Sequence, residues 1–283
     1  MKYIYCLVVI AFFQSSCMRK VVSKVHTSSV FTGGIEGPAT DYQGNLYVVN
    51  FQKEGTIGVV PKGKQEPSLL VNLPGTSVGN GIRFLNDSLF YVADYVNHNV
   101  LLVNKNSKEV KVHAHDSLMN QPNDIAINSN GNLYASDPNW GNKTGQLWLV
   151  ESNGKTVLLE KNMGTTNGVE VSPDGKSLYV NESVQGNVWK YDILPSGRVS
   201  NKKLFYHFKD FGMDGMRCNK KGDLYLARYG KGTIAVLSSK GKLLHEILLQ
   251  GSKPTNVTFN PSQTLLYITM QEKKWVEVVH LAP

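Results

Sequence analysis

The sequence predicts an all-β fold, a six-bladed β-propeller made of four-stranded antiparallel blades. The first observation is a motif that occurs six times, in which a polar or acidic residue precedes a short apolar strand, a turn and a second strand. The second is its spacing of 44, 43, 44, 47 and 42 residues, because a period of about 40–45 residues that holds only strands is typical of propeller blades. The third is the lack of any useful length of helical periodicity. The lead residues of the motifs are Glu36, Asn80, Asn123, Asn167, Asp214 and Asn256.

Each repeat divides into short strands because apolar residues alternate with polar ones and the pattern breaks at turn residues. Gly44, Gly131, Gly175 and Gly222 fall between the first two strands of their units, where a hairpin turn needs a positive φ. Four strands of about six residues plus their turns account for one period. The later strands of units one to five are expected at NLYVVNF, TIGVVPK and PSLLVNL; LFYVADY, NVLLVNK and EVKVHAH; NLYASDP, QLWLVES and KTVLLEK; SLYVNES, NVWKYDI and KLFYHFK; DLYLARY, TIAVLSS and KLLHEIL.

The sixth unit is one strand short. After NVTFNP, LLYITM and KWVEVVHL no segment remains for a fourth strand, whereas residues 21–31 near the N-terminus contain the strand-like sequence KVHTSSVF. We therefore expect this N-terminal segment to supply the outer strand of the last blade. Such a closure joins both ends of the chain and removes the exposed sheet edge of an open array.

Residues 1–16, MKYIYCLVVIAFFQSS, predict a secretory signal peptide, because the apolar run is too short to span a bilayer and ends in small residues. Cys17 follows directly, as in a bacterial lipoprotein cleavage box, so we expect it to be the lipidated first residue of a single mature domain, residues 17–283. Ordinary cleavage nearby, with Cys17 incidental, is the alternative. The expected location is periplasmic or cell-surface, with a lipid anchor as the only attachment to a bacterial membrane.

Composition limits the partners. The formal net charge of +8 is scattered in lysine pairs at hairpin turns, whereas nucleic-acid binding favours a contiguous basic stripe, so we expect no nucleic-acid partner. Of three cysteines, Cys6 leaves with the signal and a lipidated Cys17 cannot pair, so Cys218 remains without a disulfide partner. The fold must then be held by strand packing and ring closure, and we expect a monomer.

The lead residues suggest a cation site. If each opens the innermost strand of its blade, six oxygen-bearing side chains converge on one axis, two of them the carboxylates Glu36 and Asp214. Such a set suits Ca²⁺, which takes 6–8 oxygen ligands. Mg²⁺, Mn²⁺ or Zn²⁺ are the alternatives, although the His and Cys ligands that Zn²⁺ prefers are absent from these positions. The competing interpretation is that these residues only cap turns.

In order and spacing, the motifs EGPATD, QPNDIAINSNGNLYASDPNWG, TNGVEVSPDGKSLYV, MDGMRCNKKGDLYLARYG and PTNVTFNPSQTLLYIT resemble the senescence-marker-protein/gluconolactonase/luciferin-regenerating-enzyme-like (regucalcin-like) propellers. The resemblance runs from about Glu36 to the last blade. It implies one divalent ion held by Glu36, Asn167 and Asp214, with Asn123 close by on the metal, its water or the substrate. It also implies a metal-dependent hydrolase that opens sugar lactones or related esters, with Asp214 and Asn123 as the catalytic residues.

Three positions depart from the family pattern. Thr40 stands where EGPxWD has Trp, Gln121 replaces an Arg that faces sugar hydroxyls, and SDPNWG places Trp140 where relatives have TDPxYG. We expect Gln121, Trp140 and Asn80 in a substrate pocket for a small lactone or ester, and Asn256 at the rim or in a turn cap. Two other functions remain open: a non-catalytic binding propeller with a structural ion, and a phosphotriesterase-like hydrolase.

Overall fold

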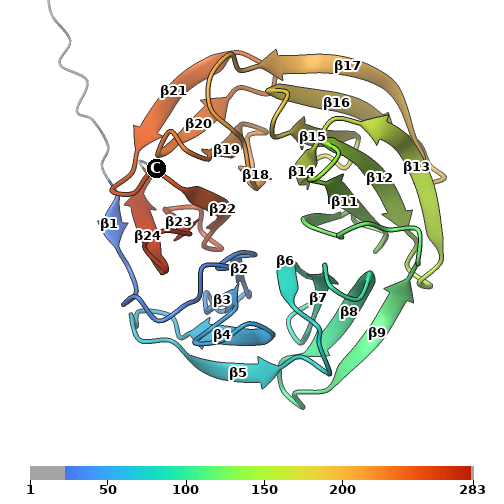
Figure 1. Cartoon of the computed structure of the whole chain (residues 1–283). Helices are drawn as coiled ribbons and strands as arrows, with labels where there is room; N and C mark the ends of the chain where they lie inside the picture. Colours follow the sequence, from blue (N-terminus) through green and yellow to red (C-terminus); the bar gives the residue numbers. More distant parts are fainter. Residues whose placement is uncertain (1–22, 282–283) are drawn as a thin grey trace, which may run out of the picture.

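The computed structural model describes residues 23–281 and places them in a ring of six four-stranded sheets (Figure 1). Neighbouring strands within each sheet are antiparallel, and in the first five blades their order from the axis outward follows the chain. The predicted six-bladed propeller is therefore confirmed. This part of the chain forms strands and turns, and it contains no helix with the length and apolar character that crossing a bilayer requires.

Each blade has four strands, and the innermost strand is the shortest in blades 1, 3 and 5. Blades 1 to 3 consist of β2 (Ala39–Thr40), β3 (Leu46–Val49), β4 (Thr56–Val60) and β5 (Ser68–Asn72); β6 (Gly79–Phe84), β7 (Leu89–Asp94), β8 (Asn99–Asn104) and β9 (Val110–His115); β10 (Ile125–Ile127), β11 (Leu133–Asn139), β12 (Thr144–Val150) and β13 (Thr156–Met163). Blades 4 to 6 consist of β14 (Thr166–Val171), β15 (Ser177–Glu182), β16 (Asn187–Ile193) and β17 (Val199–His207); β18 (Met216–Cys218), β19 (Leu224–Arg228), β20 (Thr233–Leu237) and β21 (Leu243–Leu248); β22 (Pro254–Phe259), β23 (Leu265–Met270), β24 (Trp275–His280) and β1 (Lys24–Val25).

The N-terminal strand closes the ring, as the short sixth unit predicts. β1 pairs with β24, with Lys24 opposite Val278 and Val25 opposite Glu277. The fully buried Glu277 carboxylate accepts hydrogen bonds from Ser23 Oγ and from the backbone N–H of Gln250. The ring is therefore closed by the hydrogen bonds to the Glu277 carboxylate as well as by the pairing of β1 with β24.

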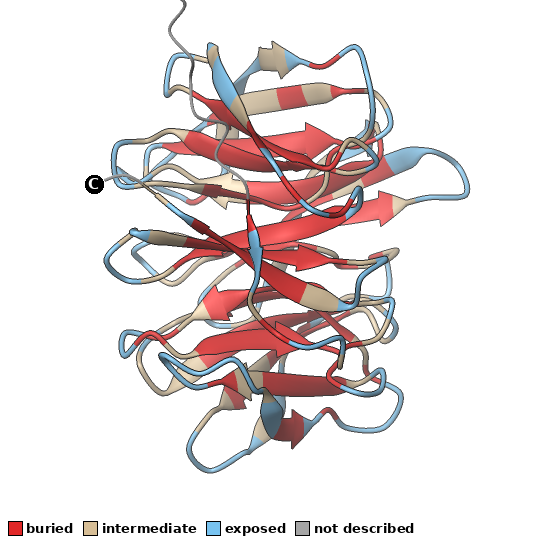
Figure 2. Cartoon of the chain, turned by 90° about the vertical axis from the view of Figure 1, so that its left-hand side faces the viewer, coloured by how far each residue is buried: buried red, intermediate tan, exposed pale blue. Residues whose placement is uncertain are grey.

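The hydrophobic core lies between blades rather than at the axis. The buried apolar side chains form six clusters, each drawn from two adjacent blades. The second strand of every blade contributes a buried tyrosine from the repeated LY or FY pair, and these are Tyr47, Tyr91, Tyr134, Tyr179, Tyr225 and Tyr267. Figure 2 shows the result, buried strands stacked against one another with exposure concentrated in the connecting loops. Because this packing lies between the blades, the polar lead residues can line the axis.

Two glycines bring the inner strands close together. A Cβ at Gly37, where φ is +54°, would lie 1.9 Å from the Asn80 carbonyl oxygen. A Cβ at Gly215 would lie 1.9 Å from Cγ of Asn256. The glycines that follow Glu36 and Asp214 therefore let the next lead residue pack directly against the chain.

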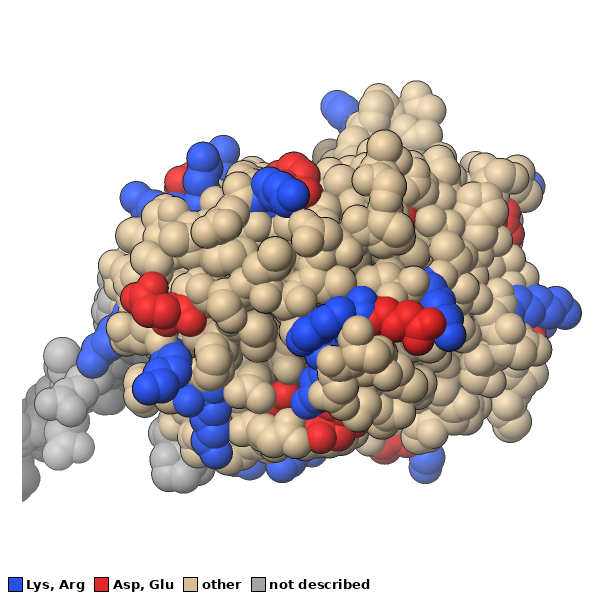
Figure 3. All heavy atoms as spheres, turned by 90° about the horizontal axis from the view of Figure 1, so that it is seen from below, with Lys and Arg blue, Asp and Glu red and all other residues tan. Residues whose placement is uncertain are grey.

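The predicted hairpin glycines adopt the conformation their turns require, with φ between 70° and 90° at Gly44, Gly131, Gly175 and Gly222. On the edge of the ring drawn in Figure 3, basic side chains are interspersed with acidic ones and form no continuous stripe. Cys218 is a free thiol in the described chain. The predicted signal peptide and Cys17 lie outside the described residues.

Candidate functional site

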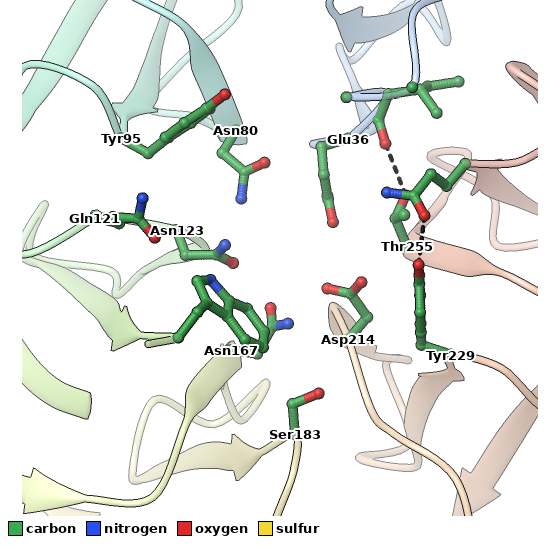
Figure 4. Close-up of a pocket in the computed structure, with 15 residues that line it drawn as sticks. Glu36, Asn80, Tyr95, Gln121, Asn123, Asn167, Ser183, Asp214, Tyr229 and Thr255 are labelled. Carbon is green, nitrogen blue, oxygen red and sulfur yellow. Dashed lines mark hydrogen bonds between the residues drawn. The ribbon is translucent and has the colours of Figure 1, made fainter. Parts of the chain in front are cut away.

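The loops at one end of the ring enclose a cavity of about 380 Å³ on the axis (Figure 4). Two kinds of segment line it: the innermost strands at their first residues, with the connections that lead into them, and the turns between the second and third strands. All the side chains that the sequence assigns to the site contribute to this lining, and they are Glu36, Asn80, Gln121, Asn123, Trp140, Asn167 and Asp214. The structure thus brings together residues that are up to 178 positions apart in the chain.

The four predicted metal ligands face one another. Figure 4 shows Asn123 and Asn167 on one side of the cavity, with Glu36 and Asp214 opposite them. The Oδ1 atoms of Asn123 and Asn167 are buried and accept no hydrogen bond. A buried acceptor without a partner costs about 1–3 kcal/mol, so these two oxygens fit a site that is completed by a cation.

The two carboxyl groups are destabilised in their charged forms. Burial raises the pKa of Glu36 to about 7, against a hydrogen bond from the Gly37 N–H at 2.7 Å that favours ionisation. Burial and then the charge of Glu36 raise the pKa of Asp214 well above its usual range. A nearby positive charge would reverse both shifts.

A buried ion cluster lies against these ligands, and sequence reasoning missed it. The Arg83 guanidinium contacts Asp124 at 3.3 Å and Glu170 at 3.3 Å, and Arg217 approaches Asp124 at 3.7 Å. These residues come from blades 2 to 5, and three of them share one signal. Arg83, Glu170 and Arg217 each stand three residues after a lead residue, so they follow it on the inner strand.

The axial charges do not balance within the protein. The described axial groups comprise four acids, Glu36, Asp124, Glu170 and Asp214, against two arginines. Their formal sum is −2, which one divalent cation would neutralise. In residues 23–281 no group of three or more His, Cys, Asp or Glu side chains is arranged as metal ligands. The donor set is instead two carboxylates plus amide oxygens, a chemistry that favours Ca²⁺ over Zn²⁺.

Asn256 is buried and not at the rim, so that alternative is wrong, whereas the turn-cap alternative is compatible with a local bond that its side chain accepts from the next residue. Its side chain is 1% exposed, and its Oδ1 accepts from the Val257 N–H at 2.9 Å and lies 3.5 Å from Arg217 Nη1. A hydrogen bond from Asn256 also stabilises the ionised form of Glu36. Asn256 therefore belongs to the buried network that includes Arg217. Asn80, at the equivalent position of blade 2, lines the cavity instead.

Buried polar groups at the ends of the second strands fix the loops that carry the ligands. In blades 2 to 4 the group is a carboxylate that accepts from backbone N–H groups a few residues before the lead residue. The bonds run from Val78 N to Asp94 (3.1 Å), from Asn120 N and Gln121 N to Asp137 (2.8 and 2.6 Å), and from Gly164 N to Glu182 (2.9 Å). Blades 2 to 4 thus each position their own cavity residue, which gives the rigidity that a binding site needs.

The mouth of the cavity carries three aromatic side chains, of which the sequence predicted only Trp140. Tyr95, Trp140 and Tyr229 line it from three blades, each directly after the second strand. The signal was present in the repeats YVADY and LYLARY, where a second aromatic residue follows the strand. Tyr229 Oη donates to Gln271 Oε1 of the neighbouring blade 6.

Comparison with known proteins finds relatives that match most of the chain. The pattern that defines the SMP-30/Gluconolactonase/LRE-like region matches residues 35–272. A gluconolactonase of Zymomonas mobilis is 25% identical over 273 residues, covering 83% of this chain and 75% of its own. A diisopropyl-fluorophosphatase of Loligo vulgaris is 25% identical over 279 residues, covering 86% and 87%.

Solved structures share the fold. Regucalcin of Agrobacterium tumefaciens, described as a calcium-binding protein, superposes with a TM-score of 0.80 at 19% identity, over 92% of this chain and 94% of its own. A luciferin-regenerating enzyme gives a TM-score of 0.77 at 20% identity, over 92% and 95%. Because the family pattern spans most of the chain and ends in the last blade, the protein belongs to the SMP-30/gluconolactonase/LRE-like family of β-propellers.

Proposed function

We propose that this protein is a divalent-metal-dependent hydrolase that opens lactones or related esters in the axial cavity. The observation that carries the proposal is the pair of partnerless amide oxygens, Asn123 Oδ1 and Asn167 Oδ1, facing Glu36 and Asp214. These four residues would hold one Ca²⁺ ion, with Mg²⁺, Mn²⁺ or Zn²⁺ as less favoured occupants. A bound ion would supply Lewis-acid stabilisation of the negative charge that develops on the carbonyl oxygen.

The protein's own groups supply the proton transfers. Asp214, once ionised beside a cation, accepts the proton of the attacking water while the water oxygen bonds to the carbonyl carbon. The ring C–O bond then breaks, and the departing oxygen takes the proton back from Asp214, which gives the hydroxy acid and restores the Asp214 carboxylate. Asn123 can donate from its Nδ2 group and so orient the substrate or the water. Asn80, Gln121 and Trp140 line the cavity beside them.

The experiment that tests this proposal is a panel of lactones and aryl esters assayed with and without chelator. The expected result is turnover that chelation removes and Ca²⁺ restores. Turnover that survives complete chelation would contradict metal dependence. Ca²⁺ binding without any turnover would favour a non-catalytic propeller with a structural ion.

A second candidate function is phosphotriester hydrolysis. The similarity to the Loligo vulgaris diisopropyl-fluorophosphatase is as high as that to the gluconolactonase and covers more of the relative. The same charge stabilisation would act on a phosphoryl oxygen. Aryl phosphotriesters therefore belong in the panel, and preference for them over all carboxylic esters would support this second function.

We further propose that the chain is exported and is held to a membrane through a lipidated Cys17, as its N-terminal sequence suggests. The catalytic domain would then act as a monomer on small molecules outside the cytoplasm, without a nucleic-acid partner.

A further inference from the structure

A side chamber of about 510 Å³ opens from the axial cavity. Both spaces are lined by Trp140, Ser183 and Tyr229, so the chamber continues the cavity outward over blades 3 to 5. Its volume lies within the roughly 300–1,000 Å³ typical of small-molecule sites. A molecule that reacts at the axis therefore has room to extend into it.

The chamber exposes large apolar side chains. Trp140, Val184 and Phe211 line it and are 44%, 55% and 57% exposed. Single exposed hydrophobic residues are ordinary, whereas several around one hollow mark a binding site. The hollow adjoins Asp214, which stands three residues after Phe211 on the same loop.

Phe211 is exposed to solvent and its backbone is strained. Its φ is +47°, a left-handed conformation that is strained for a bulky side chain. The fully buried Arg228 donates to the carbonyl oxygens of both neighbours, Asp210 and Gly212. The Arg228 guanidinium also lies 3.7 Å from the centre of the Phe208 ring. The loop that leads into blade 5 is thus held through its carbonyl groups, whereas the corresponding loops of blades 2 to 4 are held through their N–H groups. These hydrogen bonds from Arg228 fix the backbone on both sides of Phe211.

The hydroxyl groups of Ser183 and Tyr229, which line both spaces, are already engaged within the protein. Ser183 Oγ donates to the Met213 carbonyl oxygen, and Tyr229 Oη donates to Gln271. Asp210 is paired with Arg228 and Lys231. These hydroxyl donors are therefore not free to hydrogen-bond the hydroxyl groups of a sugar, which leaves Trp140 as the exposed part of the shared wall. Gln185, His207 and Lys209 also line the chamber, and the Gln185 amide is engaged by the backbone of Lys143 and Thr165.

We propose that the side chamber binds the alkyl or aryl substituent of the substrate, with Phe211 as a specificity-determining residue. The substrate class is then an apolar-substituted lactone or ester rather than a polyhydroxylated sugar lactone. This inference rests on the proposed hydrolase function for the position of the reacting carbonyl.

The test measures kcat/KM at saturating Ca²⁺ for δ-lactones that carry no substituent, a butyl group or an octyl group. For the wild type, the ratio of octyl to unsubstituted kcat/KM is expected to be about tenfold or more, since buried apolar area is favourable. Phe211→Asn should reduce this ratio to near unity. Because Asn adopts a left-handed φ more readily than Phe, the same variant should have an unchanged or higher Tm. A ring with a merely structural role would instead lower the Tm.

The matched control is Leu244→Asn, at a half-exposed position on the outer strand β21 of blade 5, which should keep the wild-type ratio. Three results would overturn the proposal. The first is a wild-type ratio of octyl to unsubstituted kcat/KM near unity, and the second is a Phe211→Asn variant that keeps the preference for the octyl lactone. The third is a sugar lactone that the wild type opens faster than the octyl lactone. If no lactone is opened, the hydrolase proposal fails by itself. Calorimetry with the corresponding lactams then tests whether the side chamber binds the substituent. Affinity that rises with chain length in the wild type but not in Phe211→Asn would support it, and affinity independent of chain length would overturn it.

Discussion

Glu36 of blade 1 and Asp214 of blade 5 lie on the same side of the axial cavity, opposite Asn123 and Asn167, with their carboxyl groups close enough to interact. After burial itself, the charge of Glu36 is the largest cause that raises the pKa of Asp214. Two buried carboxylates in such proximity are stable together only when a proton or a cation accompanies them. The two carboxyl groups therefore require a positive charge, from a proton or a bound cation, to be stable in this site.

The first prediction concerns pH. The folded-state pKa of Glu36 is raised from 4.5 to about 7, so its proton stabilises the folded protein below pH 4.5 and this stabilisation is lost as the pH rises through 7. Chelated protein should lose on the order of 3 kcal/mol of unfolding free energy from this group between pH 4.5 and 8. Added Ca²⁺ should raise the Tm more at pH 8 than at pH 5.

Comparison with Glu36→Gln isolates this contribution from other titrating groups. The variant should show a smaller decline in Tm with pH in chelator than the wild type. Parallel pH profiles of the two proteins would show that Glu36 ionises freely and would contradict the prediction.

The second prediction concerns the general base. Asp214→Asn removes the proton acceptor at the axis, so kcat should fall by about 10²–10⁴-fold. Because the substitution also removes a buried carboxyl with a raised pKa, the Tm in chelator at pH 8 should not fall. Steady-state kinetics and thermal unfolding check both statements, with Asp174→Asn in an exposed turn as the control. Unchanged turnover would remove Asp214 from the mechanism.

The third prediction concerns the ion cluster. Asp124→Asn leaves the buried Arg83 and Arg217 without their common carboxylate, so the unfolding free energy should drop by about 3–5 kcal/mol. Denaturant unfolding measures this loss. Asp192→Asn on the surface should change the stability by no more than about 0.5 kcal/mol, and an equally small effect at Asp124 would show that the cluster is not a stabilising element.

The fourth prediction concerns attachment. If Cys17 carries the lipid, Cys17→Ser should move the protein from the membrane fraction to the soluble exported fraction, because no other membrane segment is expected. Fractionation of cells that express each form is the measurement. Persistent membrane association of the serine variant would refute lipidation.

Much of the fold was readable from the sequence because the blades repeat. The spacing of the lead residues predicted six units, and the strand missing after β24 predicted that residues near Lys24 would close the ring. The convergence of Glu36, Asn123, Asn167 and Asp214 on one cavity followed from the same repeat, since equivalent positions in a ring face one axis.

Contacts across the axis were not readable in this way. Arg83 and Glu170 are 87 residues apart, and nothing in a single sequence shows that their side chains meet beneath the ligands. Asn256 and Asn80 occupy equivalent positions, yet of the two only Asn256 contacts Arg217 of the buried network. The exposure of Phe211 depends likewise on Arg228, seventeen positions later in the chain. Such asymmetries arise from side-chain partners and not from the repeat.

The most direct test of the central claim is the initial rate of lactone opening as a function of free Ca²⁺, measured for chelated wild type and Glu36→Gln. The axial site predicts that the wild-type rate rises from near zero and saturates with a single binding event. It also predicts that Glu36→Gln needs at least roughly 100-fold more Ca²⁺ for half-saturation, because a direct ligand should matter at least as much as the outer-shell groups that cost 10–100-fold. Glu66→Gln, an exposed acid between β4 and β5, should match the wild type. A rate independent of Ca²⁺, or equal half-saturation in wild type and Glu36→Gln, would contradict a catalytic metal site on the axis.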